Sequence, residues 1–167
     1  MPTLLECAAK EGRSVFVLGG KEDAAHKAAE NIKARYPGLV VVGALSPSMG
    51  FEKKPEEVAY IREKLQKVKP DILLACFGCP KQEKWVSEHY RDCASGVTLC
   101  AGATVDFLAG NIKRAPKVFS ENGLEWFYRF VKEPKRLFHR YFVDDMQIFR
   151  LAWKYRNAGP EHDSDVK

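Results

Sequence analysis

Short apolar runs alternate with amphipathic stretches over the first two-thirds of this 167-residue chain, and this alternation limits the folds open to it. The apolar runs, expected as strands, are residues 14–20, 39–45, 71–78 and 97–102. The stretches between them, expected as helices, are residues 21–38, 55–70 and those around 81–92. Continuous apolar strands joined by amphipathic helices predict βαβ units. We therefore expect an α/β fold whose parallel sheet is covered by helices on both faces.

The last third of the chain differs from the rest in charge and composition. Residues 1–110 carry 15 Lys and Arg against 14 Asp and Glu, whereas residues 111–157 carry 11 against 5 and hold 11 of the 19 aromatic residues. We expect an α/β core over residues 1–110, a basic, aromatic helical appendage over residues 111–157 and a disordered tail over residues 158–167. The appendage either packs on the sheet or meets anionic lipid or a lipid-linked phosphate. No motif that reads nucleic acid accompanies its charge, so nucleic acid is not an expected partner.

Composition favours a cytoplasmic protein. The sequence lacks the run of about eighteen apolar residues that a membrane span needs, and it has no basic leader of a secretory signal. Five scattered cysteines are typical of reduced cytosolic thiols. Cys76 and Cys79 form a C-x-x-C pair, but Cys76 lies inside an apolar run and no second pair completes a zinc set. A redox or metal site is therefore the less favoured interpretation.

Open parallel sheets bind ligands at the carboxyl ends of their strands. The predicted strands place five segments there, namely residues 19–21, 46–54, 78–83, 102–106 and the chain that follows. Gly19 and Gly20 permit close approach of the backbone to a phosphate or a sugar. No complete glycine-rich fingerprint surrounds them, so a plain tight turn is the favoured interpretation.

The stretch GCPKQEK, residues 78–84, directly follows a predicted strand. Pro80 would open a helix whose first N–H groups are free to meet an anion. The amide of Gln82 both donates and accepts hydrogen bonds, which suits a sugar or the edge of a base. Alternatively, Lys81 and Glu83 are solvated residues of an ordinary first helical turn.

Asp106 lies between Val105 and Phe107 in an apolar stretch, where a carboxylate without a partner is costly. The two hydroxyl groups of a ribose or another sugar would be suitable partners. An ion pair with Arg114 is the structural alternative.

With these stretches identified, the chain resembles the WecG/TagA/CpsF family of bacterial glycosyltransferases. The segments that carry the resemblance run from about Met1 to Arg140 and are VFVLGGK, ARYPGL, FGCPKQEKW, CAGATVDFLAGNIKRAP and GLEWFYRFVKEPKRLFHRYF. The resemblance implies a Rossmann-like nucleotide-sugar-binding core and transfer of an N-acetylated amino sugar, typically N-acetylmannosamine, from UDP. The acceptor would be a sugar on undecaprenyl diphosphate at the inner face of the cytoplasmic membrane, in teichoic acid or exopolysaccharide synthesis. Inversion at the anomeric carbon, no metal or other cofactor, peripheral membrane attachment and a homo-oligomer are also implied.

Carried over by position, the resemblance implies that Gln82 lies in the nucleotide-sugar site and that Asp106 binds the ribose of UDP. The loop around Phe51 would approach the uracil. Arg129 and Arg136 would meet the diphosphate charge, and Arg140, which follows His139, is a further candidate for that contact. Guanidinium groups suit this role because they form paired hydrogen bonds to phosphate.

Family members usually carry further residues ahead of the stretch that matches MPTLLECAAKEG. Those residues include a threonine of the substrate site and an aspartate proposed as the general base. We expect the sheet to lack strands accordingly and to leave an apolar edge open. No catalytic base is assigned, because Asp106 is expected on ribose and nothing supports Glu83 in that role. The alternative to an active transferase is a truncated, non-catalytic remnant that binds UDP-sugar or membrane.

Overall fold

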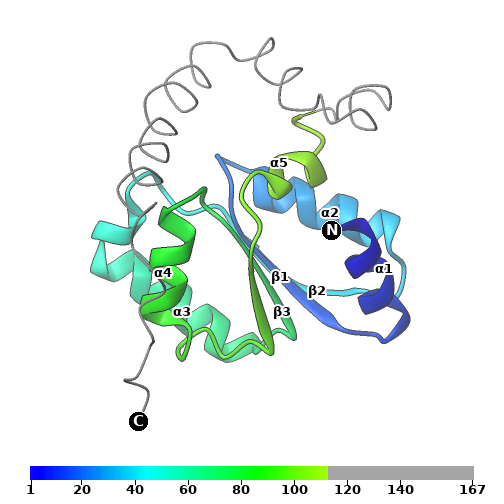
Figure 1. The fold of residues 1–167 in the computed structure, drawn as a ribbon, viewed down its shortest axis with the longest axis horizontal. Helices are drawn as coiled ribbons and strands as arrows, with labels where there is room; N and C mark the ends of the chain where they lie inside the picture. The colour runs from blue at the N-terminus through cyan, green and yellow to red at the C-terminus, as the bar shows by residue number, and fades with distance from the viewer. Residues whose placement is uncertain (113–167) are drawn as a thin grey trace, which may run out of the picture. The chain divides into compact units, whose positions relative to one another are not determined.

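Four parallel strands form the centre of the computed structural model, which describes residues 1–112 (Figure 1). The strands are β1 (Ser14–Gly19), β2 (Val40–Leu45), β3 (Ile72–Cys76) and β4 (Val97–Cys100), in the spatial order β2-β1-β3-β4. The helices are α1 (Pro2–Lys10), α2 (Ala24–Arg35), the 3₁₀ helix η1 (Phe51–Lys53), α3 (Pro55–Val68), α4 (Lys81–His89) and α5 (Thr104–Leu108). The expected α/β class and parallel sheet are confirmed.

The chain divides into two compact units, Met1–Lys113 and Arg114–Lys167. The described residues belong to the first unit. The predicted helical appendage over residues 111–157, except for its first two residues, and the predicted tail over residues 158–167 lie outside the described part.

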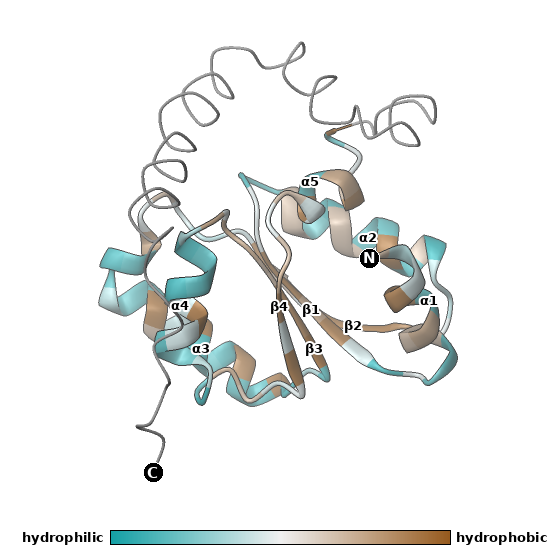
Figure 2. Cartoon of the chain, viewed as in Figure 1, coloured by the Kyte–Doolittle hydropathy of each residue, from teal (hydrophilic) through white to brown (hydrophobic). Residues whose placement is uncertain are grey.

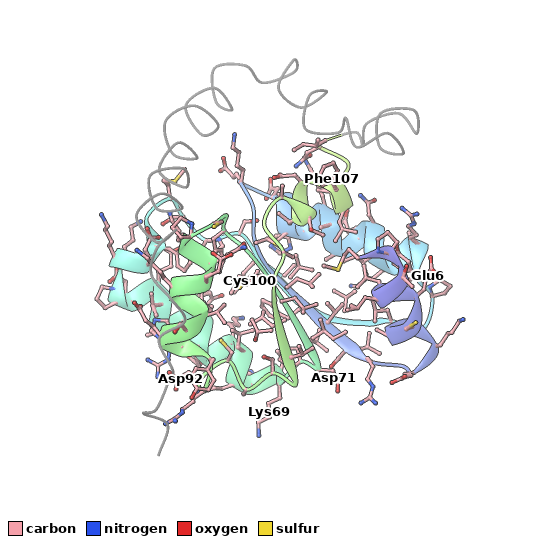
Figure 3. The ribbon with its side chains drawn as sticks, in the orientation of Figure 1. Glu6, Lys69, Asp71, Asp92, Cys100 and Phe107 are labelled. Atoms are coloured by element: carbon pink, nitrogen blue, oxygen red, sulfur yellow. The ribbon has the colours of Figure 1, made fainter. Side chains whose placement is uncertain are left out.

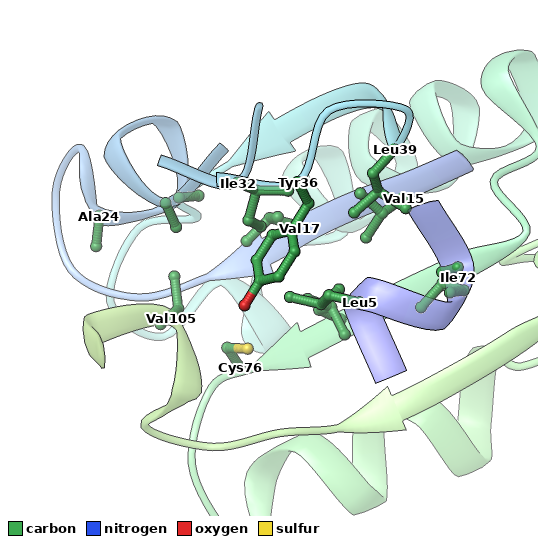
Figure 4. Packing of buried hydrophobic residues seen from close by; sticks show 14 residues of the cluster. Leu5, Val15, Val17, Ala24, Ile32, Tyr36, Leu39, Ile72, Cys76 and Val105 are labelled. Atoms are coloured by element: carbon green, nitrogen blue, oxygen red, sulfur yellow. The ribbon is translucent and has the colours of Figure 1, made fainter. Parts of the chain in front are cut away.

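The sheet is covered on both faces, and each face has its own apolar cluster. Helices α1, α2 and α5 lie on one face, where Val15 and Val17 of β1 pack with Ile32 and Val105 (Figures 1 and 4). Helices α3 and α4 lie on the other face, where Phe16 and Leu18 point instead. Alternate residues of β1 therefore serve opposite clusters, as the pleat of a strand requires. Figure 2 shows the corresponding apolar strands between helices with polar outer surfaces.

Position in the sheet explains the burial of each strand. All five residues of β3 are buried, and so are all residues of β1 after Ser14. Strands β2 and β4 form the two edges within the described residues, and Val40 and Val97 remain 50% and 44% exposed. The described sheet thus has a partly exposed strand at each edge, and the open apolar edge expected from the resemblance stays a prediction.

Candidate functional site at the carboxyl edge of the sheet

The direction in which successive strands are added to the sheet reverses beside β1. From β1 the chain crosses to β2 on one side, and after α3 it returns to β3 on the other side of β1. The carboxyl ends of β1 and β3 therefore flank a topological switch point, where helices on opposite faces of the sheet leave space for a ligand. Figure 3 labels Cys100 at the carboxyl end of β4 and Asp71 and Lys69 at the opposite, amino end of the sheet.

Gly19 and Gly20 end β1 at the switch point, and packing against the protein itself explains both. A Cβ atom on Gly19 would lie 2.4 Å from the carbonyl oxygen of Cys76 at the end of β3. A Cβ atom on Gly20 would lie 2.7 Å from that of Ala24 and 3.1 Å from a methyl group of Val105. The N–H of Gly20 donates to the carbonyl oxygen of Cys76 at 3.0 Å. This supports the tight-turn interpretation, and a ligand contact of these glycines stays a prediction.

The first turn of α4 contacts two other segments of the carboxyl edge. Lys81 forms an ion pair with Glu52 of η1 at 3.1 Å. The side chain of Gln82, only 4% exposed, accepts a hydrogen bond from the N–H of Gly102 at 2.9 Å and donates one to Glu83 at 2.8 Å. Its backbone N–H donates to the carbonyl oxygen of Gly78 at 3.0 Å, so this amide at the helix start is not free for an anion. The segments FGCPKQEKW and CAGATVDFLAGNIKRAP, which both carry the resemblance, thus touch through Gln82 and Gly102.

Asp106 lies in α5, just beyond the carboxyl end of β4. Each helical residue turns by about 100°, so the helix buries Val105 and leaves Asp106 half-buried. Within residues 1–112, no hydrogen bond or ion pair engages its carboxylate. It lies near enough to Cys76 for its charge to affect that thiol. A carboxylate at this edge suits a ligand that presents hydroxyl groups, and the alternative partner Arg114 lies outside the described residues.

Phe51 opens η1 and is 3% exposed. Its ring packs edge-on against Phe77, with 4.8 Å between centroids, and lies 6.1 Å from the ring of Trp85. The side chain therefore fixes the loop after β2 against β3 and α4. A contact of this loop with a base, predicted from the resemblance, would use its backbone or its exposed residues.

The C-x-x-C pair joins one buried and one exposed thiol. Burial, followed by smaller effects that include the charge of Asp106, raises the pKa of Cys76 to about 12, so its thiol stays protonated at neutral pH. Cys79 is exposed and both thiols are free. No group of three His, Cys, Asp or Glu residues in the described part could hold a metal ion.

The predicted diphosphate contacts Arg129, Arg136 and Arg140 lie outside the described residues. The sequence placed Ser46, Glu52 and Gly102 in segments expected at the carboxyl edge but assigned no role to any of them. The hydroxyl of Ser46 accepts from the N–H of Ala25 at 3.1 Å and donates to the carbonyl oxygen of Gly19 at 3.3 Å, which joins α2 to the end of β1. The predicted strand ends were a signal for Ser46 and Gly102, since Ser46 directly follows β2 and Gly102 lies two residues after the end of β4, but the partners were not evident. Among the described helices, none is long and apolar enough to cross a bilayer.

These observations define an α/β protein with a candidate ligand site at a switch point, built by two motifs that meet there. The pattern of the family described as "Glycosyl transferase WecG/TagA/CpsF family" matches residues 1–161. The chain belongs to this family, and the resemblance stated from the sequence is confirmed.

Three bacterial relatives carry the name "N-acetylglucosaminyldiphosphoundecaprenol N-acetyl-beta-D-mannosaminyltransferase". The chain is 28% identical to that of Bacillus spizizenii over 165 residues, 30% to that of Bacillus subtilis over 133 and 31% to that of Staphylococcus aureus over 137. These alignments cover 99%, 80% and 82% of this chain, but only 62%, 50% and 52% of the respective relatives. The chain thus spans little more than half the length of these relatives.

Proposed function

We propose that the chain forms the nucleotide-sugar-binding part of a glycosyltransferase that moves N-acetylmannosamine, or a similar N-acetylated amino sugar, from UDP. The acceptor is a sugar on undecaprenyl diphosphate at the inner face of the cytoplasmic membrane, in the synthesis of teichoic acid or another surface polysaccharide. Family membership and the names of the relatives support the transferred sugar and the acceptor.

One observation carries the location of the site. The family motifs around Gln82 and Asp106 meet beside the switch point, and the carboxylate of Asp106 has no partner among the described residues. In the proposal this carboxylate accepts hydrogen bonds from the ribose hydroxyl groups of UDP. The loop that Phe51 holds in place lies at the uracil, and Gly19 and Gly20 line the phosphates.

The proposed reaction is a single displacement that inverts the anomeric carbon. A hydroxyl oxygen of the acceptor attacks the anomeric carbon, the bond from that carbon to the β-phosphate oxygen breaks, and UDP leaves with the electron pair. The proton of the acceptor hydroxyl passes to a general base, which we assign to no residue of the described part. Arg129, Arg136 and Arg140 stabilise the charge of the departing diphosphate, so the proposal requires no metal.

A transfer assay tests the proposal. Purified full chain is mixed with UDP-N-acetylmannosamine and N-acetylglucosaminyl-diphosphoundecaprenol in lipid vesicles containing EDTA, and the lipid product is measured by mass spectrometry. UDP binding with product formation supports the transferase. UDP binding without product identifies a UDP-sugar-binding remnant instead, and folded protein that binds no UDP contradicts both. Replacing Arg129 and Arg136 by Gln should reduce turnover while leaving the thermal midpoint unchanged.

A further inference from the structure

We propose that Gln82 is a positioning residue, which holds the turn before α5, and hence Asp106, through its bond to Gly102. Its influence on UDP rests on the proposed function, whereas its hold on Gly102 does not. In this account the amide of Gln82 needs no direct contact with the donor.

The position of Gly102 in the chain explains why its backbone N–H needs a hydrogen-bond acceptor from a side chain. The N–H of Ala101, one residue earlier, donates to the carbonyl oxygen of Ala75 at 2.8 Å and continues the pairing with β3. The N–H of Thr104, two residues later, donates to the carbonyl oxygen of Ala101 at 3.0 Å and starts α5. Between these bonds, the N–H of Gly102 donates to Oε1 of Gln82. This bond therefore fixes the chain where the sheet ends and the helix with Asp106 begins.

Glu83 determines which way the amide of Gln82 faces. Its carboxylate accepts from the Nε2 group of Gln82 at 2.8 Å, while Oε1 faces the donor of Gly102. Turning the amide over would place two donors against each other at Gly102 and two acceptors against each other at Glu83. Both neighbours thus select one orientation. Burial of Gln82 makes an unpaired group there costly, so the orientation is strongly specified.

Two variants separate positioning from direct contact. Gln82→Met keeps the length of the side chain and removes the acceptor. The double variant Gln82→Glu with Glu83→Gln keeps an acceptor for Gly102 and restores a donor from position 83, but removes the donor of residue 82. Glu88→Gln is the control for removing the carboxylate of Glu83, since Glu88 lies exposed on the same helix.

Two measurements are made on each full-length variant: the hydrogen exchange of the Gly102 amide by NMR without ligand, and the affinity for UDP by calorimetry. We expect Gln82→Met to lose the protection of Gly102 and to bind UDP about tenfold more weakly, as expected for one lost buried hydrogen bond. The double variant should keep the protection and bind UDP within about threefold of the wild type, as the retained acceptor requires. Glu88→Gln should match the wild type in both.

Several results would overturn the inference. Unchanged exchange at Gly102 in Gln82→Met would show that Gln82 does not hold the turn. If the double variant keeps the protection but binds UDP as weakly as Gln82→Met, the donor of residue 82 contacts the ligand directly. If Gln82→Met does not fold, the affinity of the double variant for UDP alone decides whether the donor of residue 82 contacts the ligand. Failure of the wild type to bind UDP would reject the proposed function, while the exchange data would still decide whether Gln82 holds Gly102.

Discussion

The Nζ atom of Lys81 lies 3.1 Å from Oε1 of Glu52, and this ion pair connects the first turn of α4 to η1 in the loop after β2. The next residue, Gln82, bonds to Gly102 before α5. Two consecutive side chains therefore connect three separate segments at the carboxyl edge. A hydrogen bond to its own backbone amide and the pairing with Lys81 lower the pKa of Glu52, so the pair persists into mildly acidic solution.

Replacing Lys81 by Met should weaken UDP binding more than it weakens the fold. The side chains of the pair are 35% and 26% exposed, so its loss should cost at most about 1 kcal/mol of stability. The loop proposed to approach uracil would lose a fixed position, and calorimetry should show a weaker affinity for UDP. Lys84→Met, on the exposed face of the same helix, is the control. Equal effects of the two variants on UDP affinity would contradict this role.

Replacing Asp106 by Asn should weaken UDP binding by about tenfold or more, because a carboxylate accepts hydroxyl hydrogens more strongly than an amide does. Its carboxylate has no partner among the described residues, so the thermal midpoint should change little. Calorimetry and thermal unfolding on the same samples check both statements. A lowered midpoint with unchanged affinity would instead favour the structural ion pair with Arg114.

Asp71 should make the stability of the fold depend on acidic pH. Its carboxylate accepts from the hydroxyl and the N–H of Ser14, and these bonds, with the charge of Arg13, lower the pKa of Asp71. A lowered pKa stabilises the fold above the unfolded value of about 3.9, and the gain is lost as the pH falls through the folded pKa. Asp71→Asn should therefore lower the thermal midpoint at pH 7, with a difference that shrinks below pH 4. A difference that stays constant with pH would exclude this linkage.

The cysteines should fall into two classes of reactivity. Burial raises the pKa of Cys76 to about 12 and that of Cys93 to about 11, whereas Cys7, Cys79 and Cys100 are exposed. Burial and the charge of Glu83 also raise the pKa of Cys100, so this thiol should be the slowest of the three exposed ones. Iodoacetamide at pH 8 should therefore alkylate the three exposed thiols and spare the two buried ones until unfolding. UDP should slow the alkylation of Cys100 at the carboxyl edge and leave that of Cys7 unchanged. Mass spectrometry measures each site, and a disulfide between Cys76 and Cys79 would revive the redox interpretation.

The sequence predicted those strands and helices that bury a long apolar surface. Strands β1 and β3 are buried on both faces, so they stand out as continuous apolar runs, and α3 carries apolar residues at Val58, Ile61 and Leu65. Helices α1 and α5 were not predicted. Helix α1 buries only Leu5 and Ala8, so its sequence displays little apolar periodicity, and α5, with five residues, contains too few turns to display a helical period.

Candidate site residues were predictable where their sequence neighbours mark them. They were not predictable where their role depends on a partner far along the chain. Asp106 was recognisable as a candidate because a carboxylate is unusual in an apolar stretch. The partner of Gln82, by contrast, is a backbone amide 20 residues further along, which no side-chain pattern indicates. A tight turn was the favoured prediction for Gly19 and Gly20, and only the structure shows that Gly19 approaches the end of β3 and Gly20 approaches Ala24 and Val105.

A titration with UDP, followed by NMR of the glycine amides, tests the central claim that the nucleotide binds at the carboxyl edge. Gly20, Gly78 and Gly102 lie at the carboxyl ends of β1, β3 and β4, whereas Gly12 and Gly96 precede β1 and β4 at the opposite edge. UDP should shift the first group of signals and leave the second in place. Shifts confined to the second group, or none in folded protein at saturating UDP, would contradict the account.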